Sequence, residues 1–225
     1  IPELSLDGKD HIDIVMMSDI HLGVMMSRKR LGKLVDEVQK LNPDIILIAG
    51  DILDQDVAQV IRKDLGKDLV KLNAPLGVFA CTGNHEYIGG IDRATKYLND
   101  HGITLLQDSL VTIKQMFRLV GRKDHSGQRF TGEKRKNLSS IINNSNSALP
   151  IILLDHEPIH LEEAEKNGVA LQLSVHTHKG QLWPVNLITS KLFEKDYGYL
   201  KRGTTQYYIS SGAGTWGPPM RIGSS

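Results

Sequence analysis

The sequence contains a single cysteine, no apolar run long enough to span a membrane and almost no net charge. Cys81 lies within an apolar run, so it cannot form an internal disulfide and is expected to be a small core residue. The apolar stretches fall well short of the roughly 18 residues that a membrane span needs. A formal charge of +1 disfavours a nucleic-acid-binding protein.

The composition predicts one globular domain over residues 1–225, since 40% of the residues are hydrophobic and 24% are charged. No internal repeat or low-complexity segment interrupts it. The sequence begins at Ile1 instead of Met, so we expect a fragment or a processed form. Any signal peptide or membrane anchor upstream would lie outside this chain.

Five apolar runs are each followed by side chains of metal-binding types. Such β-branched-rich runs predict strands buried on both faces. In open α/β sheets, ligands bind beyond the carboxyl ends of the strands. Neighbouring strands would therefore gather two Asp, one Asn and five His, which without cysteine predicts divalent metal ions. The runs are Ile12–Ser18 before Asp19 and His21, Asp44–Gly50 before Asp51, Gly77–Gly83 before Asn84 and His85, Pro150–Asp155 before His156, and Val169–Val175 before His176 and His178.

The spacing of apolar residues also predicts the helices and the fold. Strand and helix alternate in the first half, which implies a parallel sheet with right-handed crossovers. Ile103–Leu106, Leu110–Lys114 and Phe117–Gly121 predict a patch of short antiparallel strands, and Gln206–Ser210 predicts a final strand. We expect a four-layer α/β/β/α sandwich of two mixed β-sheets flanked by helices. The predicted helices are Ser27–Leu41, Val57–Leu72, Ile91–Asp100, Leu138–Asn143 and Leu161–Asn167.

The residues at the strand ends are spaced for joint ligation. Residues i and i+2 of an extended chain point to the same side, so Asp19 and His21 could reach one ion. His176 and His178 repeat this spacing. Gly50 lets the backbone approach the site closely, and the two oxygens of the Asp51 carboxylate could bridge two cations.

These motifs, in this order, resemble those of calcineurin-like metallophosphoesterases. The resemblance runs from about residue 10 to the C-terminus. The tail Ser210–Gly217 is similar to the bacterial, often membrane-attached branch of that family, which implies membrane association through a segment upstream of Ile1. The motifs are Ser18-Asp19-Ile20-His21-Leu22-Gly23, Gly50-Asp51-Ile52-Leu53-Asp54, Gly83-Asn84-His85-Glu86, His156-Glu157-Pro158 and His176-Thr177-His178.

The resemblance implies a role for each of these positions. One divalent ion would be held by Asp19, His21, Asp51 and His178. A second would be held by Asp51, Asn84, His156 and His176, with Asp51 as the bridge. His85 matches the family's catalytic histidine, and Asp54 matches the acidic residue that orients it. The mixed oxygen and imidazole ligands suit Mn, Fe, Zn, Co or Ni.

The implied activity is hydrolysis of phosphate esters by hydroxide shared between the two ions, with His85 as general acid. Phosphodiesters are the expected substrates, ahead of phosphomonoesters and pyrophosphates, and nucleic acid is disfavoured by the charge. Because ligation needs neutral imidazoles, activity should fall at acid pH. Two alternatives stay open: a hydrolase of nucleotide-linked lipid or sugar pyrophosphates, and a non-catalytic binding scaffold.

Val175 and Lys179 stand where the family usually has glycine. The valine removes backbone freedom beside His176 and could relax one metal site, and the lysine could place a positive charge near a substrate phosphate.

Several residues also have plain structural interpretations. His85 and His156 could be hydrogen-bonded core histidines, and Asp54 could be a helix N-cap. His101 precedes Gly102, which predicts an interaction with a helix C-terminus. Arg122–Lys136 predicts a solvated basic face, with contact to an anionic substrate or lipid as the alternative. Other residues are expected at the surface (His11, His125 and His160) or beside the metal cleft (Trp216 and Arg221).

Overall fold

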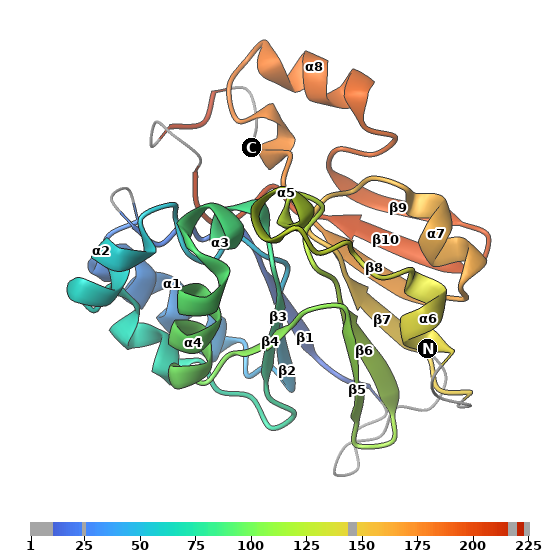
Figure 1. The fold of residues 1–225 in the computed structure, drawn as a ribbon, viewed down its shortest axis with the longest axis horizontal. Helices are drawn as coiled ribbons and strands as arrows, with labels where there is room; N and C mark the ends of the chain where they lie inside the picture. The colour runs from blue at the N-terminus through green and yellow to red at the C-terminus, as the bar shows by residue number, and fades with distance from the viewer. Residues whose placement is uncertain (1–10, 24–25, 144–147, 216–219, 223–225) are drawn as a thin grey trace.

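Two β-sheets pack face to face with helices on their outer sides in the computed structural model (Figure 1), which describes residues 11–23, 26–143, 148–215 and 220–222. This is the predicted four-layer sandwich, although only the second of its two sheets is mixed, where both were expected to be. The first sheet is entirely parallel, in the order β1-β2-β3-β4. Its strands are β1 (Ile14–Met17), β2 (Ile45–Ile48), β3 (Val78–Cys81) and β4 (Thr104–Leu106).

The second sheet is mixed and has the order β5-β6-β7-β8-β10-β9. Its four central strands run parallel, while β5 and β9 pair antiparallel at the two edges. The strands are β5 (Ser109–Ile113), β6 (Phe117–Gly121), β7 (Ile151–Leu154), β8 (Leu171–Ser174), β9 (Gly198–Arg202) and β10 (Thr205–Ile209).

The helices form the outer layers, except α8, which lies beyond the ends of the sheets. Figure 1 shows the helices from α1 to α4 beside the first sheet, α6 and α7 beside the second, and α8 above both. Their bounds are α1 (Arg28–Lys40), α2 (Val57–Arg62), η1 (Leu65–Lys71), α3 (Asn84–Gly89), α4 (Ile91–Asp100), α5 (Gly127–Thr131), α6 (Leu138–Ile142), α7 (Leu161–Lys166), η2 (His178–Gly180) and α8 (Val185–Leu192).

Strand β2 shows how the sequence produces a hydrophobic layer on each face of a sheet. Alternate side chains of a strand point to opposite faces of the sheet. Ile45 and Leu47 pack into the core between the two sheets, while Ile46 and Ile48 pack against the helices. All four are fully buried, which is why the run is continuously apolar. Cys81 is also buried in the core between the sheets, as predicted.

Two element predictions were wrong. β4 does not join an antiparallel patch, because Thr104–Leu106 pairs parallel with Phe79–Cys81 at the edge of the first sheet. The helix predicted over Val57–Leu72 ends at Arg62 and is followed by the short 3-10 helix η1. Asp64 has φ +46, a left-handed conformation that an α-helix cannot continue through. The elements α3, α5, α8 and β9 were not predicted.

The basic stretch Arg122–Lys136 is only partly a solvated face. The Arg122 side chain is buried, where its Nε donates to Asp108 Oδ1 at 2.9 Å and its Nη2 donates to the Lys136 carbonyl at 2.7 Å. Arg135 forms a two-pronged ion pair with Asp155. Arg129 and Lys134 are exposed, as expected. Arg122 is held by Asp108, from the turn between β4 and β5, and Arg135 is held by Asp155, which directly follows β7. Both carboxylates lie outside the stretch, so a count of its charges could not reveal them.

The predictions for four histidines outside the site agree with the structure. The His101 ring contacts the Tyr97 carbonyl in the last turn of α4, with 2.7 Å between Nδ1 and the oxygen. His11, His125 and His160 are exposed. Among the described residues, no helix is both long and apolar enough to cross a bilayer.

Candidate metal centre

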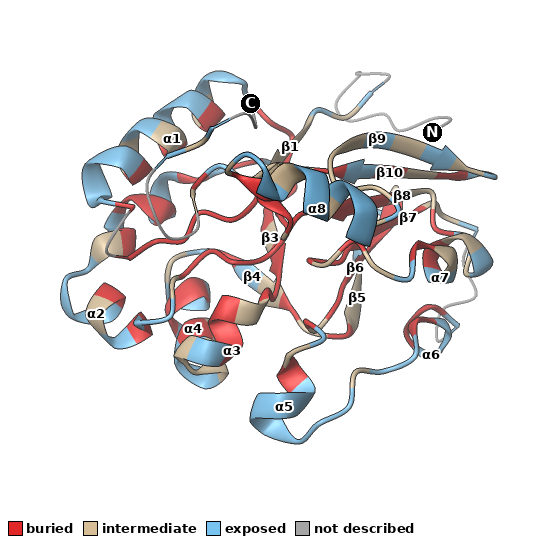
Figure 2. Cartoon of the chain, turned by 90° about the horizontal axis from the view of Figure 1, so that it is seen from above, coloured by how far each residue is buried: buried red, intermediate tan, exposed pale blue. Residues whose placement is uncertain are grey.

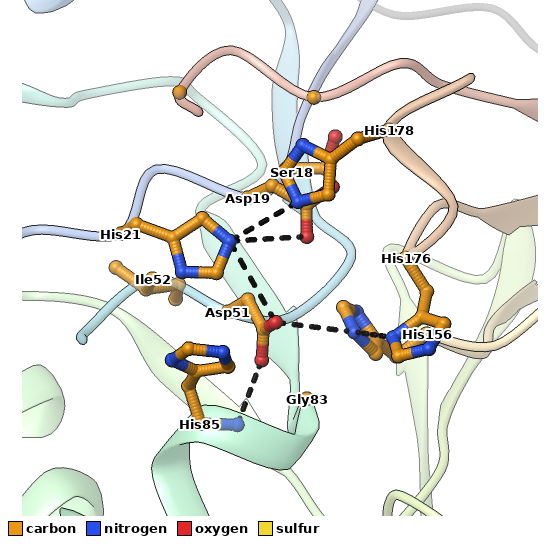
Figure 3. A network of polar contacts seen from close by, with 12 residues as sticks. Ser18, Asp19, His21, Asp51, Ile52, Gly83, His85, His156, His176 and His178 are labelled. Atoms are coloured by element: carbon orange, nitrogen blue, oxygen red, sulfur yellow. Dashed lines mark hydrogen bonds and ion pairs between the residues drawn. The ribbon is translucent and has the colours of Figure 1, made fainter. Parts of the chain in front are cut away.

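The loops that follow β1, β2, β3, β7 and β8 meet at one edge of the two sheets and carry the residues that the sequence singled out (Figure 3). Backbone hydrogen bonds join the first two loops, from Asp19 N to the Gly50 carbonyl at 3.2 Å and from His21 N to the Asp51 carbonyl at 3.0 Å. Parallel strands make this convergence, because their carboxyl ends all face the same way.

The local conformation that aims these side chains is left-handed, not extended. Asp19, His21 and Asp51 have φ values of +45, +46 and +50°, and His176 and His178 have +75 and +49°. Such values are uncommon for residues other than glycine. The prediction that an extended i, i+2 pair shares one ion was therefore based on the wrong geometry. His176 and His178 in fact point in different directions, His178 toward His21 and His176 toward His156.

The first group is formed by Asp19, His21 and His178, whose ligand atoms lie within 4.8 Å of one another. The Nε2 atoms of the two histidines are 3.2 Å apart. Asp19 Oδ1 is 4.0 Å from His21 Nε2, and Asp19 Oδ2 is 3.7 Å from His178 Nε2. Asp19 is fully buried, and neither of its carboxylate oxygens has a hydrogen-bond partner.

The second group is formed by His156 and His176, and Asn84 lines the cleft beside them. His156 Nε2 is 3.1 Å from His176 Nδ1, and His156 Nδ1 is 2.8 Å from the Ala49 carbonyl, which fixes the ring. Asn84 is the first residue of α3 and lines the same cleft as His176. Its Oδ1 is buried without a hydrogen-bond partner. Asn84 and His176 therefore line the cleft, whereas His156 is buried against His176.

Asp51 lies between the two groups. Its Oδ2 is 3.9 Å from His21 Nε2 in the first group and 3.4 Å from His156 Nε2 in the second. Its Oδ1 accepts a hydrogen bond of 2.9 Å from the His85 backbone N–H. One carboxylate thus contacts both sets of imidazoles.

The charges of these groups suit bound cations. Burial lowers the pKa of His21 and of His176 to about 4 and that of His178 to about 3, which leaves their lone pairs free at neutral pH. Burial raises the pKa of Asp19 to about 8, and the nearby His156 imidazole offsets this only in part. Burial opposes ionisation of Asp51 too, but the surrounding His156, His85 and His21 imidazoles outweigh it and lower its pKa. Unpartnered buried oxygens beside neutral imidazoles are what divalent ions coordinate.

His85 is placed to act on a ligand in the cleft. Its Nδ1 is 3.1 Å from Asp54 Oδ1, and the ring lines the cleft with 4% of the residue exposed. Burial would lower its pKa, but the Asp54 hydrogen bond and the Asp51 charge raise it. Asp54 is not the N-cap of α2, since Asp56 fills that role by accepting from Gln59 N at 2.9 Å. The His85 ring also lies within metal-ligand range of His21 and Asp51.

Two glycines allow the close approach of these loops. Gly50 has φ +89°, and a Cβ there would lie 2.7 Å from both Gly83 N and His156 Nδ1, as its place before Asp51 suggested. Gly212 has φ +83°, and a Cβ there would lie 2.8 Å from Asp19 Oδ2. The loop after β10 therefore closes over the first group.

Glu86 was missed as a functional residue although it belongs to a quoted motif. Its fully buried carboxylate accepts four backbone hydrogen bonds. Oε2 accepts from Asp51 N at 3.0 Å and Gly83 N at 2.8 Å, and Oε1 accepts from Ile52 N at 2.8 Å and Leu53 N at 3.0 Å. It clamps the Asp51 loop to the start of α3. The available signal was its position three residues after Gly83, where a glutamate reaches back to a helix N-terminus.

Val175, Lys179 and Arg221, whose roles the sequence left open, each have a structural contact. Val175 is buried and its N–H donates to the His156 carbonyl at 2.8 Å, so the valine fits the loop. The Lys179 ammonium lies 4.6 Å from the centre of the Tyr197 ring. Arg221 donates to the carbonyls of Ser211, Gly212 and Gly214, at 2.7, 3.0 and 2.7 Å, which holds the loop over the first group. Trp216 lies outside the described residues.

A cleft of about 360 Å³ opens over the centre. One wall is formed by His21, Asp51, Asn84, His85, His176 and His178, and the other includes Leu182, Val185 and Thr189 from α8 and the segment before it. Its size falls in the range of small-molecule sites.

Comparisons with known proteins agree with this site. A family profile described as "Calcineurin-like phosphoesterase" matches residues 12–180. An "Uncharacterized metallophosphoesterase" of Helicobacter pylori is 32% identical over 220 residues, covering 96% of this chain and 58% of the relative. The "UDP-2,3-diacylglucosamine pyrophosphatase LpxG" of Chlamydia muridarum is 26% identical over 263 residues, covering 90% of this chain and 78% of the relative.

Among solved structures, the 5'-nucleotidase precursor of Thermus thermophilus has the same fold, with a TM-score of 0.55 at 14% identity over 89% of this chain and 49% of that one. The chain spans little more than half the length of its Helicobacter relative. With its ordered motifs, its converging strand ends and a profile match over most of its length, the chain belongs to the calcineurin-like phosphoesterase family.

Proposed function

We propose that this protein is a metal-dependent phosphoric ester hydrolase whose centre holds two divalent cations. The observation that carries the proposal is the position of the buried Asp51 carboxylate, within 3.9 Å of His21 Nε2 on one side and 3.4 Å of His156 Nε2 on the other. A carboxylate shared by two groups of imidazoles and unpartnered oxygens suits a pair of cations, of which Mn, Fe, Zn, Co and Ni fit the ligands.

The ligand sets follow the two groups. Two bound cations would supply the positive charge that a phosphoryl group needs and the acidity that makes water a nucleophile at neutral pH. The first cation would be held by Asp19, His21, Asp51 and His178, and the second by Asp51, Asn84, His156 and His176. Support comes from the buried oxygens of Asp19 and Asn84, which have no other partner.

His85 is proposed as the general acid. When the P–O bond breaks, the leaving oxygen needs a proton, and an imidazolium can give it one from Nε2 because Nδ1 faces Asp54. Asp54 acts through His85 as a positioning residue: its carboxylate fixes the ring orientation and favours the protonated form. The substrate phosphate would lie in the cleft between His85 and α8.

Phosphodiesters remain the proposed substrates. The cleft has one polar wall and one wall that includes Leu182 and Val185, so it can take a phosphate that carries an apolar or bulky second group. The runner-up is a nucleotide-linked lipid pyrophosphate, which the name of the Chlamydia relative supports.

Hydrolysis of a chromogenic phosphodiester, bis(p-nitrophenyl) phosphate, tests the proposal. Protein reconstituted with Mn²⁺ should release nitrophenolate, and prior removal of metal with a chelator should abolish the release until Mn²⁺ is returned. Elemental analysis of the same samples should show two metal equivalents per chain before chelation. Absence of hydrolysis with each of the five metals would favour the non-catalytic scaffold instead.

His85→Ala separates catalysis from metal binding. We expect turnover to fall on the order of a hundredfold, since a positioned proton donor typically contributes at least that much, while metal content stays at the wild-type level. An exposed histidine changed in the same way, His125→Ala, provides the control. Full activity in His85→Ala would exclude His85 as the general acid, and loss of metal would make it a ligand.

A further inference from the structure

The surface around α8 carries apolar side chains that nothing in the described structure covers. Trp183, Leu187, Ile188 and Leu192 are each between 54 and 74% exposed. Met220 and Ile222 continue the surface, because Ile222 N donates to the Gln181 carbonyl and Trp183 N donates to the Ile222 carbonyl. These six residues are called the α8 surface below. Exposed apolar patches on this scale mark interaction sites.

The α8 surface has the shape of a ridge and not of a groove. No residue of α8 is buried, and the helix stands above the sandwich in Figure 1 and is exposed along most of its length in Figure 2. Val185 and Thr189, one turn apart, line the cleft, whereas Ile188 and Leu192, also one turn apart, lie on the adjoining side of the helix and face solvent. A convex apolar ridge can enter a fluid layer without a partner of matching shape.

The net charge beside the ridge is positive. Lys191 and Lys195 form no ion pair within the described part of the chain. Arg202 compensates Glu194 at 2.9 Å, which leaves the Asp196 carboxylate, whose Oδ2 accepts from Thr189 Oγ1 at 3.0 Å, against the two lysines. Lysines flanking an apolar helix face are typical of helices that lie in the interface of an anionic bilayer.

We propose that the α8 surface docks onto an anionic lipid bilayer, with α8 lying in the interfacial region. Trp183 fits this occupant, because tryptophan favours the level of the lipid headgroups, and the convex ridge with its flanking lysines favours a bilayer over a protein groove. Val185 and Thr189 belong to the same helix and line the cleft, so docking brings the cleft next to phosphate esters carried by the lipids. The docking itself does not depend on hydrolysis, so either proposal can fail without the other.

Co-sedimentation with vesicles tests this proposal on the full chain. The protein should sediment with vesicles of equimolar phosphatidylcholine and phosphatidylglycerol and much less with phosphatidylcholine alone. The double variant Leu187→Ser with Ile188→Ser should weaken binding to the mixed vesicles roughly tenfold, because two apolar side chains no longer leave water. Hydrolysis of the soluble phosphodiester without vesicles should be unchanged in this variant.

Matched controls make the result specific. Leu41→Ser with Val70→Ser removes two apolar side chains of similar exposure, 64 and 58%, from the C-cap of α1 and from η1, and should leave vesicle binding intact. Lys191→Glu with Lys195→Glu should remove the preference for anionic vesicles, whereas Lys29→Glu with Lys67→Glu should not. Equal losses from both members of either comparison would overturn the proposal.

Fluorescence locates the contact. Trp216→Phe leaves Trp183 as the one tryptophan of the 225-residue sequence, and its emission should shift to shorter wavelength when mixed vesicles are added. Two results would overturn the proposal: an unshifted emission at vesicle concentrations that sediment the protein, or a dimer in solution that Leu187→Ser with Ile188→Ser converts to a monomer, which would assign the α8 surface to a second copy of the chain.

Discussion

Asp51→Asn should remove phosphodiester hydrolysis almost completely, with turnover lowered roughly a thousandfold or more. Metal centres of this kind supply several kcal/mol of transition-state stabilisation, and each 1.4 kcal/mol is about tenfold in rate. Asparagine has the same shape as aspartate, and its side-chain oxygen can still accept the hydrogen bond from the His85 backbone N–H. What it loses is the negative charge between His21 and His156.

Metal content distinguishes this change from general damage. If Asp51 is shared by both cations, elemental analysis of Asp51→Asn should show a loss from both sites, while the urea unfolding transition stays cooperative. Asp92→Asn, an exposed aspartate at the start of α4, should keep wild-type metal and activity. Retention of two metal equivalents in Asp51→Asn would contradict the shared-ligand assignment.

Glu86→Ala should have the largest effect on stability, lowering the free energy of unfolding by about 3–5 kcal/mol. Four backbone N–H groups, those of Asp51, Ile52, Leu53 and Gly83, would lose their acceptor in a site from which water is excluded. Because these groups belong to the two loops that carry Asp51 and Asn84, we also expect metal affinity to fall. Urea denaturation with and without Mn²⁺ measures both effects.

A second substitution separates the hydrogen bonds from the packing. Glu86→Gln keeps the volume but offers one acceptor oxygen in place of two, so it should restore only part of the stability lost in Glu86→Ala. Glu37→Ala removes an exposed glutamate from α1 and serves as the control. If Glu86→Gln were as stable as wild type and bound as much metal, the clamp would not depend on its four hydrogen bonds.

Predictions from local patterns were correct where burial sets the spacing of apolar residues along the chain. The helix predicted over Ile91–Asp100 has those bounds, and Phe117–Gly121 is a strand throughout. The order of polar residues after apolar runs identified which loops converge. Each of these features depends on a period of 2 or 3.6 residues or on the direction of a parallel strand, and these are properties of the chain near the residue concerned.

Contacts between distant segments could not be predicted, because they produce no local pattern in the sequence. Nothing around Arg122 shows that Asp108 and the Lys136 carbonyl will bury it, and nothing around Ile103 shows that β4 will add to the first sheet in parallel. No helix was predicted over Val185–Leu192, and none of its residues is buried. Partners of this kind are set by which strands become neighbours, and only the packed chain decides that.

The sequence by itself determined the layered fold and the set of side chains at the strand ends. The spacing of apolar residues shows which segments are buried, and the polar residues that follow each run lie at the carboxyl end of its strand. The tertiary structure decided how those side chains are shared: left-handed turns at Asp19, Asp51 and His178 send His176 and His178 to different groups, with Asp51 between them. It also placed α8 over the cleft. A backbone conformation held by contacts from five separate loops costs local energy, which is recovered only when all five are packed together.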